Sequence, residues 1–294
     1  MEWSDRMNAA IDYIEANLAG KIDFTEAAKN ACCSLFHFQR MFMVIIGVTP
    51  AEYARKRRLT LAARELTSGN PKVIDIALKY GYDSPDSFTR AFRNVHGITP
   101  QAAREPGVTL TAFPRISFNI LLKGGNDMDY RIIEKPAFDI LGRSRKFRTV
   151  NGENFIKIPQ FWHEYMATDE YKTLMDLTEG KPGAVTGGGC LGVCFGGEET
   201  NWDPFSYGIG IEKPAKTSLV IFEVIPVPAA AWAVFDCTLD NLQDVTKRIF
   251  SEWFPSTGYE HAPAPEIEVY LPGDFANTAM KCQIWIPVVK KKKK

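Results

Sequence analysis

The chain has 294 residues, and 45% of them are hydrophobic, which is enough for two globular domains with ordinary cores. Its 35 basic and 35 acidic side chains balance, but the first 107 residues hold 14 basic and 12 acidic ones, whereas residues 108–289 hold 16 and 23. A weakly basic first part therefore precedes an acidic second part, whose own affinity for DNA is expected to be poor.

The first predicted element is an amphipathic helix, indicated by Ile11, Ile14 and Leu18, and it does not follow the pattern of a signal peptide. No apolar run is long enough to span a membrane. The six cysteines show no zinc-ligand spacing, so free thiols of a reducing compartment are expected. These features predict a cytoplasmic protein with no membrane contact, no metal and no other cofactor.

The next elements repeat one pattern at an offset of 50 residues. Residues 34–42 and 84–92 align without gaps, and each is followed by a Gly-x-Thr-Pro sequence. In each copy a helical apolar spacing leads to a turn, to a serine that can cap the next helix (Ser34 or Ser84), and to a second helix with a buried stripe. Two helix-turn-helix units at a fixed spacing suit B-DNA, whose major groove returns every ~34 Å.

A helix from about residue 50 to residue 66 is predicted to join the two copies. It carries the basic run Arg55-Lys56-Arg57-Arg58, which is long enough to lie along a phosphate backbone. We therefore predict phosphate contacts by Lys56, Arg57 and Arg58. The alternative is that the run is only a solvated helix face.

Residues 1–107 resemble the two-motif DNA-binding domain of the AraC/XylS family of transcription regulators. The motifs that carry the resemblance are Phe38-Gln39-Arg40-Met41-Phe42, Gly47-x-Thr49-Pro50, Ile76-Ala77-x-x-x-Gly81-Tyr82, Ser87-Phe88-x-Arg90-x-Phe92 and Gly97-x-Thr99-Pro100. The resemblance implies that the second helix of each motif enters the major groove. The positions that would then face the bases are Phe36, Gln39, Arg40, Asp86, Thr89 and Arg90.

The chemistry of these residues agrees with base recognition. Arginine forms bidentate hydrogen bonds with guanine and glutamine with adenine, and threonine or phenylalanine contacts the thymine methyl group. Two sets of alternatives stay open: Arg40 and Arg90 contact only phosphate or pair with a carboxylate, and Asp86 caps its helix or lies outside the groove instead of accepting from cytosine. His37 lies beside these positions and either touches phosphate or is a solvated surface side chain.

A junction near Glu105-Pro106-Gly107 separates the two parts of the chain. The boundaries that follow are a DNA-binding domain at 1–107, a connector at 108–127 with an extended stretch at 110–123 and a glycine-rich break at 124–127, and a second domain at 128–294. The second domain is predicted to repeat a strand-helix-strand-strand order. Its expected elements are strands at 130–133 and 138–147, a helix at 154–165 and strands at 190–195 and 206–212, and then strands at 218–224 and 230–237, a helix at 242–254 and strands at 265–271 and 281–288.

This order predicts a multi-domain protein, in which an all-α double helix-turn-helix domain precedes an α+β domain with a curved antiparallel sheet and two helices on one side. Residues 128–289 resemble the GyrI-like effector-binding domain, a multidrug-sensing module. The motifs that carry the resemblance are Ile156-x-x-x-x-x-Trp162, Glu268-x-Tyr270-x-Pro272 and Cys282-x-Ile284-x-Ile286-Pro287-Val288. The domain order resembles that of the Rob-type regulators, and the resemblance implies one buried glutamate for lipophilic cations, at Glu268.

The alternation of a strand places Glu266, Glu268 and Tyr270 on one face. A carboxylate among aromatic rings suits a lipophilic cation, because each ring adds ~0.5–2 kcal/mol of cation–π attraction. The candidate rings are Trp162, Tyr207, Trp232, Trp253, Tyr270 and Trp285, and for each of them plain core packing is the alternative. Glu266 is expected to be a solvated charge at the edge of the strand.

The leading hypothesis is a transcription regulator, not an enzyme, that binds double-stranded DNA and a small, lipophilic and cationic effector. One alternative is a constitutive DNA-binding protein whose second domain contacts other proteins, for example RNA polymerase. Another is a GyrI-like domain that hydrolyses a small reactive molecule, with a pocket glutamate orienting water. The sequence shows neither a nucleophile–base pair nor a metal-ligand cluster for such chemistry.

Overall fold

The computed structural model describes residues 3–69, 71–118, 127–148, 152–196, 204–214 and 221–291. The chain forms two compact units, one of Met1–Leu35 with Pro50–Leu122 and the other of Phe36–Thr49 with Lys123–Lys294. The second unit therefore contains a helix from the first 50 residues, α3 (Leu35–Ile46). The glycine-rich break predicted at 124–127 lies outside the described residues except for Asp127.

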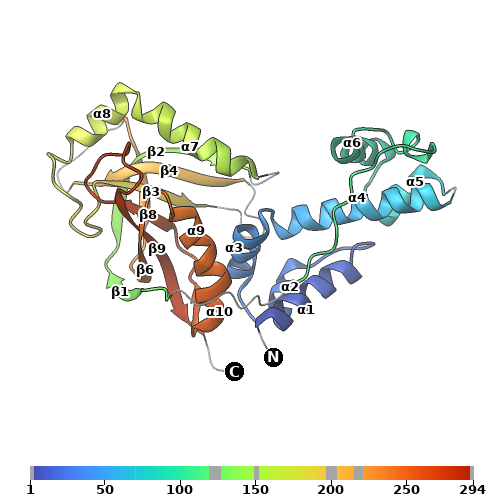
Figure 1. Ribbon diagram of the computed structural model, residues 1–294, viewed down its shortest axis with the longest axis horizontal. Coiled ribbons are helices and arrows are strands. Elements are labelled where there is room, and N and C mark those ends of the chain that lie inside the picture. The colour runs from blue at the N-terminus through green and yellow to red at the C-terminus, as the bar shows by residue number, and fades with distance from the viewer. Residues whose placement is uncertain are drawn as a thin grey trace. The chain divides into compact units, whose positions relative to one another are not determined.

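In the described part of the first unit, all regular secondary structure is helical. Its elements are α1 (Trp3–Ala16), α2 (Phe24–Asn30), α4 (Pro50–Ser68), α5 (Val73–Lys79), α6 (Pro85–His96) and a 3-10 turn (Ala102–Arg104) (Figure 1). The start of α6 follows from local sequence, because the Ser84 side chain accepts a hydrogen bond from the backbone N–H of Ser87 and Pro85 occupies the first position. The helix ends at Gly97, whose φ of 75° suits glycine.

The core of the second helix-turn-helix forms between α4, α5 and α6. Phe88 and Phe92 of α6 are completely buried, and they pack with Leu59 of α4 and Ile76 and Ala77 of α5. These are the apolar positions that the helical spacing predicted to face inward. The second motif is therefore confirmed as a helix-turn-helix with its own core.

The second unit is built on one antiparallel sheet with helices. Its strands are β1 (Arg131–Lys135), β2 (Phe138–Phe147), β3 (Cys190–Phe195), β4 (Phe205–Glu212), β5 (Glu223–Val227), β6 (Ala230–Thr238), β7 (Tyr259–His261), β8 (Glu266–Tyr270) and β9 (Lys281–Lys290). Its helices, besides α3, are α7 (Glu153–Met166), α8 (Asp169–Asp176), α9 (Leu242–Arg248), a π-helical turn (Ile249–Trp253) and α10 (Phe254–Ser256). Helix α8 and strand β7 were not predicted, and β5 begins five residues later than expected.

The order of the strands confirms the internal duplication. The sheet runs β1-β6-β9-β8-β3-β4-β2-β5, and β7 pairs with β9. The strands β1, β2, β3 and β4 of the first half correspond to β5, β6, β8 and β9 of the second half. With this correspondence, the order β1-β6-β9-β8 from one end of the sheet is equivalent to the order β5-β2-β4-β3 from the other end. The first strand of each half lies at the edge of the other half, and the two halves meet at the β3–β8 pair.

The two faces of the sheet have different roles. One face carries a core cluster that includes Ile140 of β2 and Trp285 of β9, although three strands separate β2 from β9. The sheet must therefore curl so that this face becomes interior. The other face lies against α7 and α9, as the two-helix prediction required (Figure 1).

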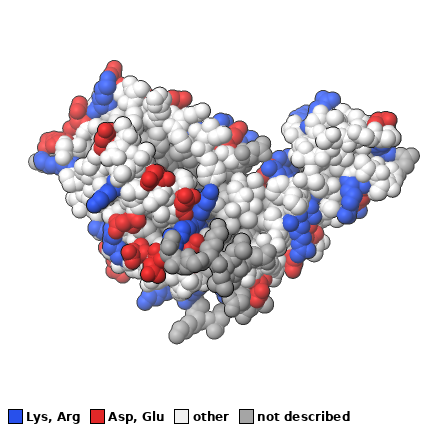
Figure 2. All heavy atoms as spheres, viewed as in Figure 1, with Lys and Arg blue, Asp and Glu red and all other residues white. Residues whose placement is uncertain are grey.

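Among the described helices, none combines the length and the apolar character that crossing a lipid bilayer demands. Figure 2 shows acidic and basic side chains interspersed on the visible face of each unit. Because the charges are mixed, affinity for a charged partner depends on individual contacts more than on a broad field.

Candidate functional site

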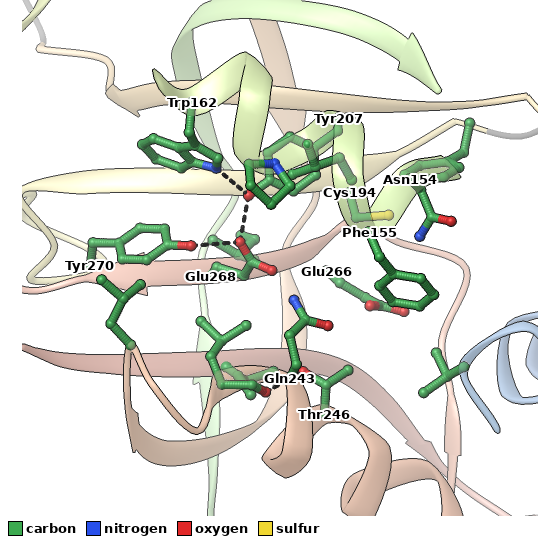
Figure 3. A pocket seen from close by; sticks show the side chains of 18 of the residues that line it. Asn154, Phe155, Trp162, Cys194, Tyr207, Gln243, Thr246, Glu266, Glu268 and Tyr270 are labelled. Atoms are coloured by element: carbon green, nitrogen blue, oxygen red, sulfur yellow. Dashed lines mark hydrogen bonds between the residues drawn. The ribbon is translucent and has the colours of Figure 1, made fainter. Parts of the chain in front are cut away.

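A cavity of about 470 Å³ lies between α7, α9, α3 and one face of the sheet. Strands β3, β4 and β8 form its floor with Cys194, Tyr207 and Glu268, and α7 contributes Trp162 (Figure 3). Most of the remaining lining is apolar. It includes Met43, Val44, Phe155, Ile158, Pro159, Met166, Leu239, Leu242, Phe275 and Ile284.

Glu268 is the carboxylate at the centre of the floor. It accepts hydrogen bonds from the hydroxyl groups of Tyr207 and Tyr270, the latter at 2.8 Å, and Trp162 Nε1 donates to the Tyr207 hydroxyl at 2.9 Å (Figure 3). Burial raises the pKa of the Glu268 carboxyl, although the two tyrosines and the charge of Arg40 oppose this shift. A carboxylate held by neutral donors in an apolar site retains an attraction for a cation.

Three of the predicted pocket rings line this cavity and three do not. Trp162, Tyr207 and Tyr270 lie around Glu268, and the sequence analysis missed a fourth ring, Phe275, whose centre is 5.3 Å from that of Tyr270. A motif search cannot find Phe275, because it lies in the loop that follows β8.

The predictions for Trp232, Trp253 and Trp285 are wrong for this cavity. Trp232 and Trp285 belong to the core on the opposite face of the sheet. Trp253 stacks on Tyr259 and packs edge-on against Phe235, away from the cavity. Alternation along a strand shows which residues share a face, but it does not show which of the two faces holds the cavity.

The prediction that Glu266 is a solvated strand-edge charge is also wrong. Glu266 is 6% exposed and lines the same cavity. Arg40 donates to it from Nε and Nη2, one to each carboxylate oxygen, and His261 Nε2 lies 2.9 Å from Oε1. Burial alone would raise the pKa of this carboxyl, but the charge and hydrogen bonds of Arg40, together with the hydrogen bond to His261, lower it to about 2.

The partner of Glu266 comes from α3, the second helix of the first repeated motif. His37 is buried, its ring packs 4.6 Å from that of Phe254, and its Nδ1 accepts from the backbone N–H of His261 at 3.3 Å. Burial lowers the pKa of the His37 imidazole to about 3. The ring of Phe36 lies 4.8 Å from that of His261.

The predicted base-facing residues of the two motifs therefore differ in exposure. In the first motif, His37, Gln39 and Arg40 are buried, so His37 is not the solvated side chain of one alternative, and Arg40 pairs with a carboxylate, as the alternative for it allowed. In the second motif, Asp86 and Arg90 on α6 are exposed, and the neighbouring Thr89 is half-buried. Base contacts by either set stay a prediction.

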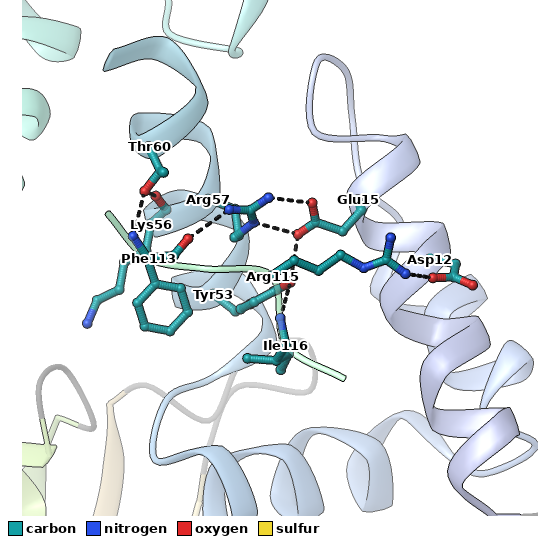
Figure 4. A network of polar contacts seen from close by, with 9 residues as sticks. All are labelled: Asp12, Glu15, Tyr53, Lys56, Arg57, Thr60, Phe113, Arg115 and Ile116. Carbon is teal, nitrogen blue, oxygen red and sulfur yellow. Dashed lines mark hydrogen bonds and ion pairs between the residues drawn. The ribbon is translucent and has the colours of Figure 1, made fainter. Parts of the chain in front are cut away.

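The basic run on α4 is not the free helix face that the sequence indicated. Arg57 donates to Glu15 at 2.8 and 2.9 Å and to the carbonyl of Phe113 (Figure 4). Arg58 donates to the carbonyls of Leu18 and Gly20. The side chains of Arg57 and Lys56 are only 11% and 16% exposed.

The basic face of α4 is covered by the stretch after the second motif, which runs back along α4 and α1. Phe113 N–H donates to Thr60 on α4 and Arg115 pairs with Asp12 on α1 (Figure 4). Asn8 of α1 exchanges hydrogen bonds with the backbone of Phe118. Residues 108–118 are therefore extended, as predicted, and they occupy the basic face of α4.

Known families account for both parts of the chain. The profile of the integron-associated effector binding proteins matches residues 131–288, which is more than half of the chain, and a helix-turn-helix domain profile matches residues 27–106. The chain belongs to the AraC-type regulators with a GyrI-like effector-binding domain. Both predicted resemblances are confirmed, and with them the functions of DNA binding and transcription regulation.

Individual proteins are similar to one part of this chain or the other. The HTH-type transcriptional activator AarP of Providencia stuartii is 41% identical over 92 residues, which are 31% of this chain and 68% of that protein. The transposon Tn10 TetD protein of Escherichia coli is 42% identical over 92 residues, which are 31% of this chain and 67% of that protein. Among solved structures, SAV2435 bound to tetraphenylphosphonium is 19% identical, covers 55% of this chain and 94% of that chain, and has a TM-score of 0.43.

The described residues contain no group of three or more His, Cys, Asp or Glu side chains that could hold a metal ion. The effector-binding domain of this regulator therefore offers a ligand two carboxylates, three hydrogen-bonded aromatic groups around Glu268, and an apolar wall. A concave, largely apolar cavity with a few converging polar groups is typical of a site for a small organic molecule.

Proposed function

We propose that this regulator binds a small lipophilic cation in the cavity around Glu268 and alters transcription in response. The observation that carries the proposal is the half-buried Glu268 carboxylate, which faces an aromatic cavity and is held by two neutral tyrosine hydroxyls. Burial disfavours the charged form of this group, as the raised pKa of its carboxyl indicates. A cation that enters the cavity relieves this penalty.

The rings supply the second part of the attraction. The ring centres of Trp162, Tyr270 and Phe275 lie 5.0 to 5.6 Å apart, so they form one aromatic cluster beside the carboxylate. Each ring face adds ~0.5–2 kcal/mol for a cation within reach. The cavity of about 470 Å³ also falls in the size range of sites for drug-sized ligands, roughly 300–1,000 Å³.

Asn154 at the α7 wall supports an organic ligand with a hydrogen-bond donor. Its Oδ1 atom is buried beside the cavity and has no hydrogen-bond partner among the described residues. An unpaired buried acceptor is unfavourable, so a ligand N–H or O–H at this position would be stabilised.

We propose binding rather than catalysis in this cavity. Tyr207 and Tyr270 both donate to one oxygen of Glu268, Oε2, and these hydrogen bonds favour its charged form, which makes the carboxylate a weaker base for the activation of water. Turnover of a bound ligand would overturn this part of the proposal. Contact with RNA polymerase stays an expectation that follows from the class of regulator.

Calorimetric titration of the full chain tests the effector proposal. Tetraphenylphosphonium is the cationic probe and triphenylphosphine oxide is the neutral aromatic probe. Glu268→Gln keeps the shape of the side chain and removes its charge, so the affinity for the cation should fall at least tenfold, on the order of 1.4 kcal/mol. The affinity for the neutral probe should change much less.

Glu164→Gln is the matched control, because Glu164 lies on α7 with a side chain that is 58% exposed. This variant should bind both probes as the unmodified chain does. Equal losses for the two probes in Glu268→Gln would show that Glu268 only shapes the cavity, and no binding of the cation by the unmodified chain would refute the proposed function.

A further inference from the structure

The cavity contains a second carboxylate, and a helix of the chain's own DNA-binding motif supplies its cation. Glu266 and Glu268 are two residues apart on β8, so they point to the same side of the sheet with a spacing of about 7 Å along the strand. Both line the cavity, and so does Arg40 of α3. Arg40 is the residue whose position in the AraC-type motif implies a contact with a DNA base.

The contact between Arg40 and Glu266 has the geometry of a specific binding site for a guanidinium group. Two N–H groups along one edge of the planar Arg40 guanidinium, those of Nε and Nη2, donate to the two oxygens of Glu266. The guanidinium carbon lies 5.5 Å from the centre of the Phe250 ring, and His261 holds Glu266 from the other side. A bidentate site of this kind discriminates planar, forked donors from point charges.

We propose that Glu266 is a second subsite of the effector pocket, selective for planar amidinium or guanidinium groups, and that Arg40 is its resident internal cation. An effector that carries such a group displaces Arg40 and frees α3 for the DNA groove. This inference rests on the proposed function, since it requires that effectors enter the cavity around Glu268.

The two roles of Arg40 exclude each other. A guanidinium that donates both forked N–H groups to Glu266 cannot donate them to a guanine. The neighbouring residues of α3 are fixed in the same way, because His37 packs on Phe254 and Phe36 packs on His261. The base-reading face of α3 is therefore turned toward its own effector-binding unit in this conformation.

Charge explains why an effector is needed to release the helix. When Arg40 leaves, Glu266 becomes a buried carboxylate without a counter-charge, which is strongly unfavourable. A ligand cation at the same place removes this penalty. A positive group beside Glu268 adds to the effect, because Arg40 is a like charge on the wall of the same cavity.

The arrangement names a class of effector. A cation that reaches only Glu268 leaves the pair of Arg40 and Glu266 in place. An aromatic molecule with an amidinium group and a second positive group about 7 Å away would engage both carboxylates. The effector class that fits best is therefore the aromatic amidines and guanidines, above all the dications.

Ligand selectivity is the first test, by calorimetry on the full chain with benzamidinium and benzylammonium. These probes share a ring and a single charge, but only benzamidinium has a planar fork. The unmodified chain should prefer benzamidinium by at least tenfold, and Glu266→Gln should abolish the preference. Glu268→Gln should keep the preference, because it leaves the fork site intact. Equal affinity for the two probes in the unmodified chain would overturn the subsite.

Release of α3 is the second test, and it uses the unmodified chain. Hydrogen exchange of the backbone amides at 36–46 should speed up at least tenfold when benzamidinium saturates the protein. Duplex DNA that the full chain selects from a random library should bind at least tenfold more tightly in the presence of benzamidinium. By linkage, this DNA should tighten benzamidinium binding by the same factor.

The variants complete the test of release. Glu266→Gln, with its fold checked by circular dichroism, should bind the selected DNA at least tenfold more tightly than the unmodified chain without any ligand, and benzamidinium should have no further effect. Unchanged exchange at 36–46 and unchanged DNA affinity would overturn the inference. If tetraphenylphosphonium still bound in a manner that depended on Glu268, the proposed function would stand without it.

Discussion

Gly192 lies opposite Glu268 in the β3–β8 pair, at the point where the two halves of the sheet meet. A Cβ atom at this position would lie 2.2 Å from the Tyr207 hydroxyl and 2.6 Å from Glu268 Oε2. The absence of a side chain is therefore what allows these two groups to meet above the strand. A glycine inside a predicted strand often marks such a close approach, so the sequence did contain a signal for this part of the site.

Gly192→Ala should separate Tyr207 from Glu268 and strain the floor of the cavity. Overpacking of this kind costs about 1–3 kcal/mol of stability, and the affinity for tetraphenylphosphonium should fall as well. Gly189→Ala is the control, because a Cβ there would be 3.6 Å from Pro272, an ordinary contact. Urea unfolding and calorimetry measure the two effects, and equal behaviour of the two variants would contradict the role of Gly192.

The raised pKa of the Glu268 carboxyl makes stability depend on pH in a defined direction. An acid whose pKa is higher in the folded than in the unfolded state contributes most to stability below its unfolded pKa, about 4.3, and this contribution is lost as the pH rises through the folded value. Without ligand, Glu268→Gln should therefore be more stable than the unmodified chain at pH 7.

The difference between these two proteins should shrink as the pH approaches 4. Urea unfolding from pH 4 to pH 8 measures it, and Glu164→Gln, at an exposed site, should show no such gain. If the unmodified chain were the more stable protein at pH 7, the tyrosine hydrogen bonds would outweigh the burial of the charge.

At the level of elements, α3 and α4 show what a sequence can and cannot reveal. The capped start of α6, its buried phenylalanines and the duplicated order of the sheet depend on local spacing, and they were predicted correctly. The burial of Arg40 and Arg57 depends on partners 226 and 42 residues away, Glu266 and Glu15. No local pattern encodes such partners, so the sequence predicted DNA contacts for both arginines and could not name the carboxylate that each of them meets.

Arg57 offers a direct comparison between a structural and a DNA-contacting role. Since it donates to Glu15 and Phe113 from a largely buried position, Arg57→Ala should lower the free energy of unfolding of the full chain by about 2–3 kcal/mol. Arg64→Ala, at an exposed position on the same helix, should leave stability unchanged. Urea unfolding measures both.

The salt dependence of DNA binding separates the two roles of Arg57. A phosphate contact would instead appear as a loss of about one unit in the slope of log affinity against log salt concentration. We expect no change of this slope for Arg57→Ala at salt concentrations where the variant is folded. A reduced slope together with unchanged stability would show that Arg57 does contact a phosphate.

At the level of the whole molecule, the two motifs differ in what holds their recognition helices. Helix α6 packs within the first unit and exposes Arg90, whereas α3 belongs to the second unit and buries Arg40. If α3 and α6 are the recognition helices, as the family resemblance implies, we propose that one chain holds one that is available to DNA and one that is held by the effector-binding domain. A protein with this arrangement can change the length of DNA that it covers without a change in its oligomeric state.

Footprinting on the selected DNA tests this consequence. Without effector, a single chain should protect one major-groove segment, and Arg90→Ala should weaken binding by ~1–3 kcal/mol and relax base preference at one position. With saturating benzamidinium the protected region should extend by one helical turn, about 10 base pairs, because α3 reaches the next segment of the groove. The stoichiometry should remain one chain per site.

Glu266→Gln should give the longer footprint in the absence of any ligand. Glu268→Gln is the control, because it keeps the pair of Arg40 and Glu266 and should give the shorter one. A long footprint from the unmodified chain without effector would show that α3 is not restrained on DNA. A long footprint that requires two chains would show that dimerisation, and not the release of α3, supplies the second contact.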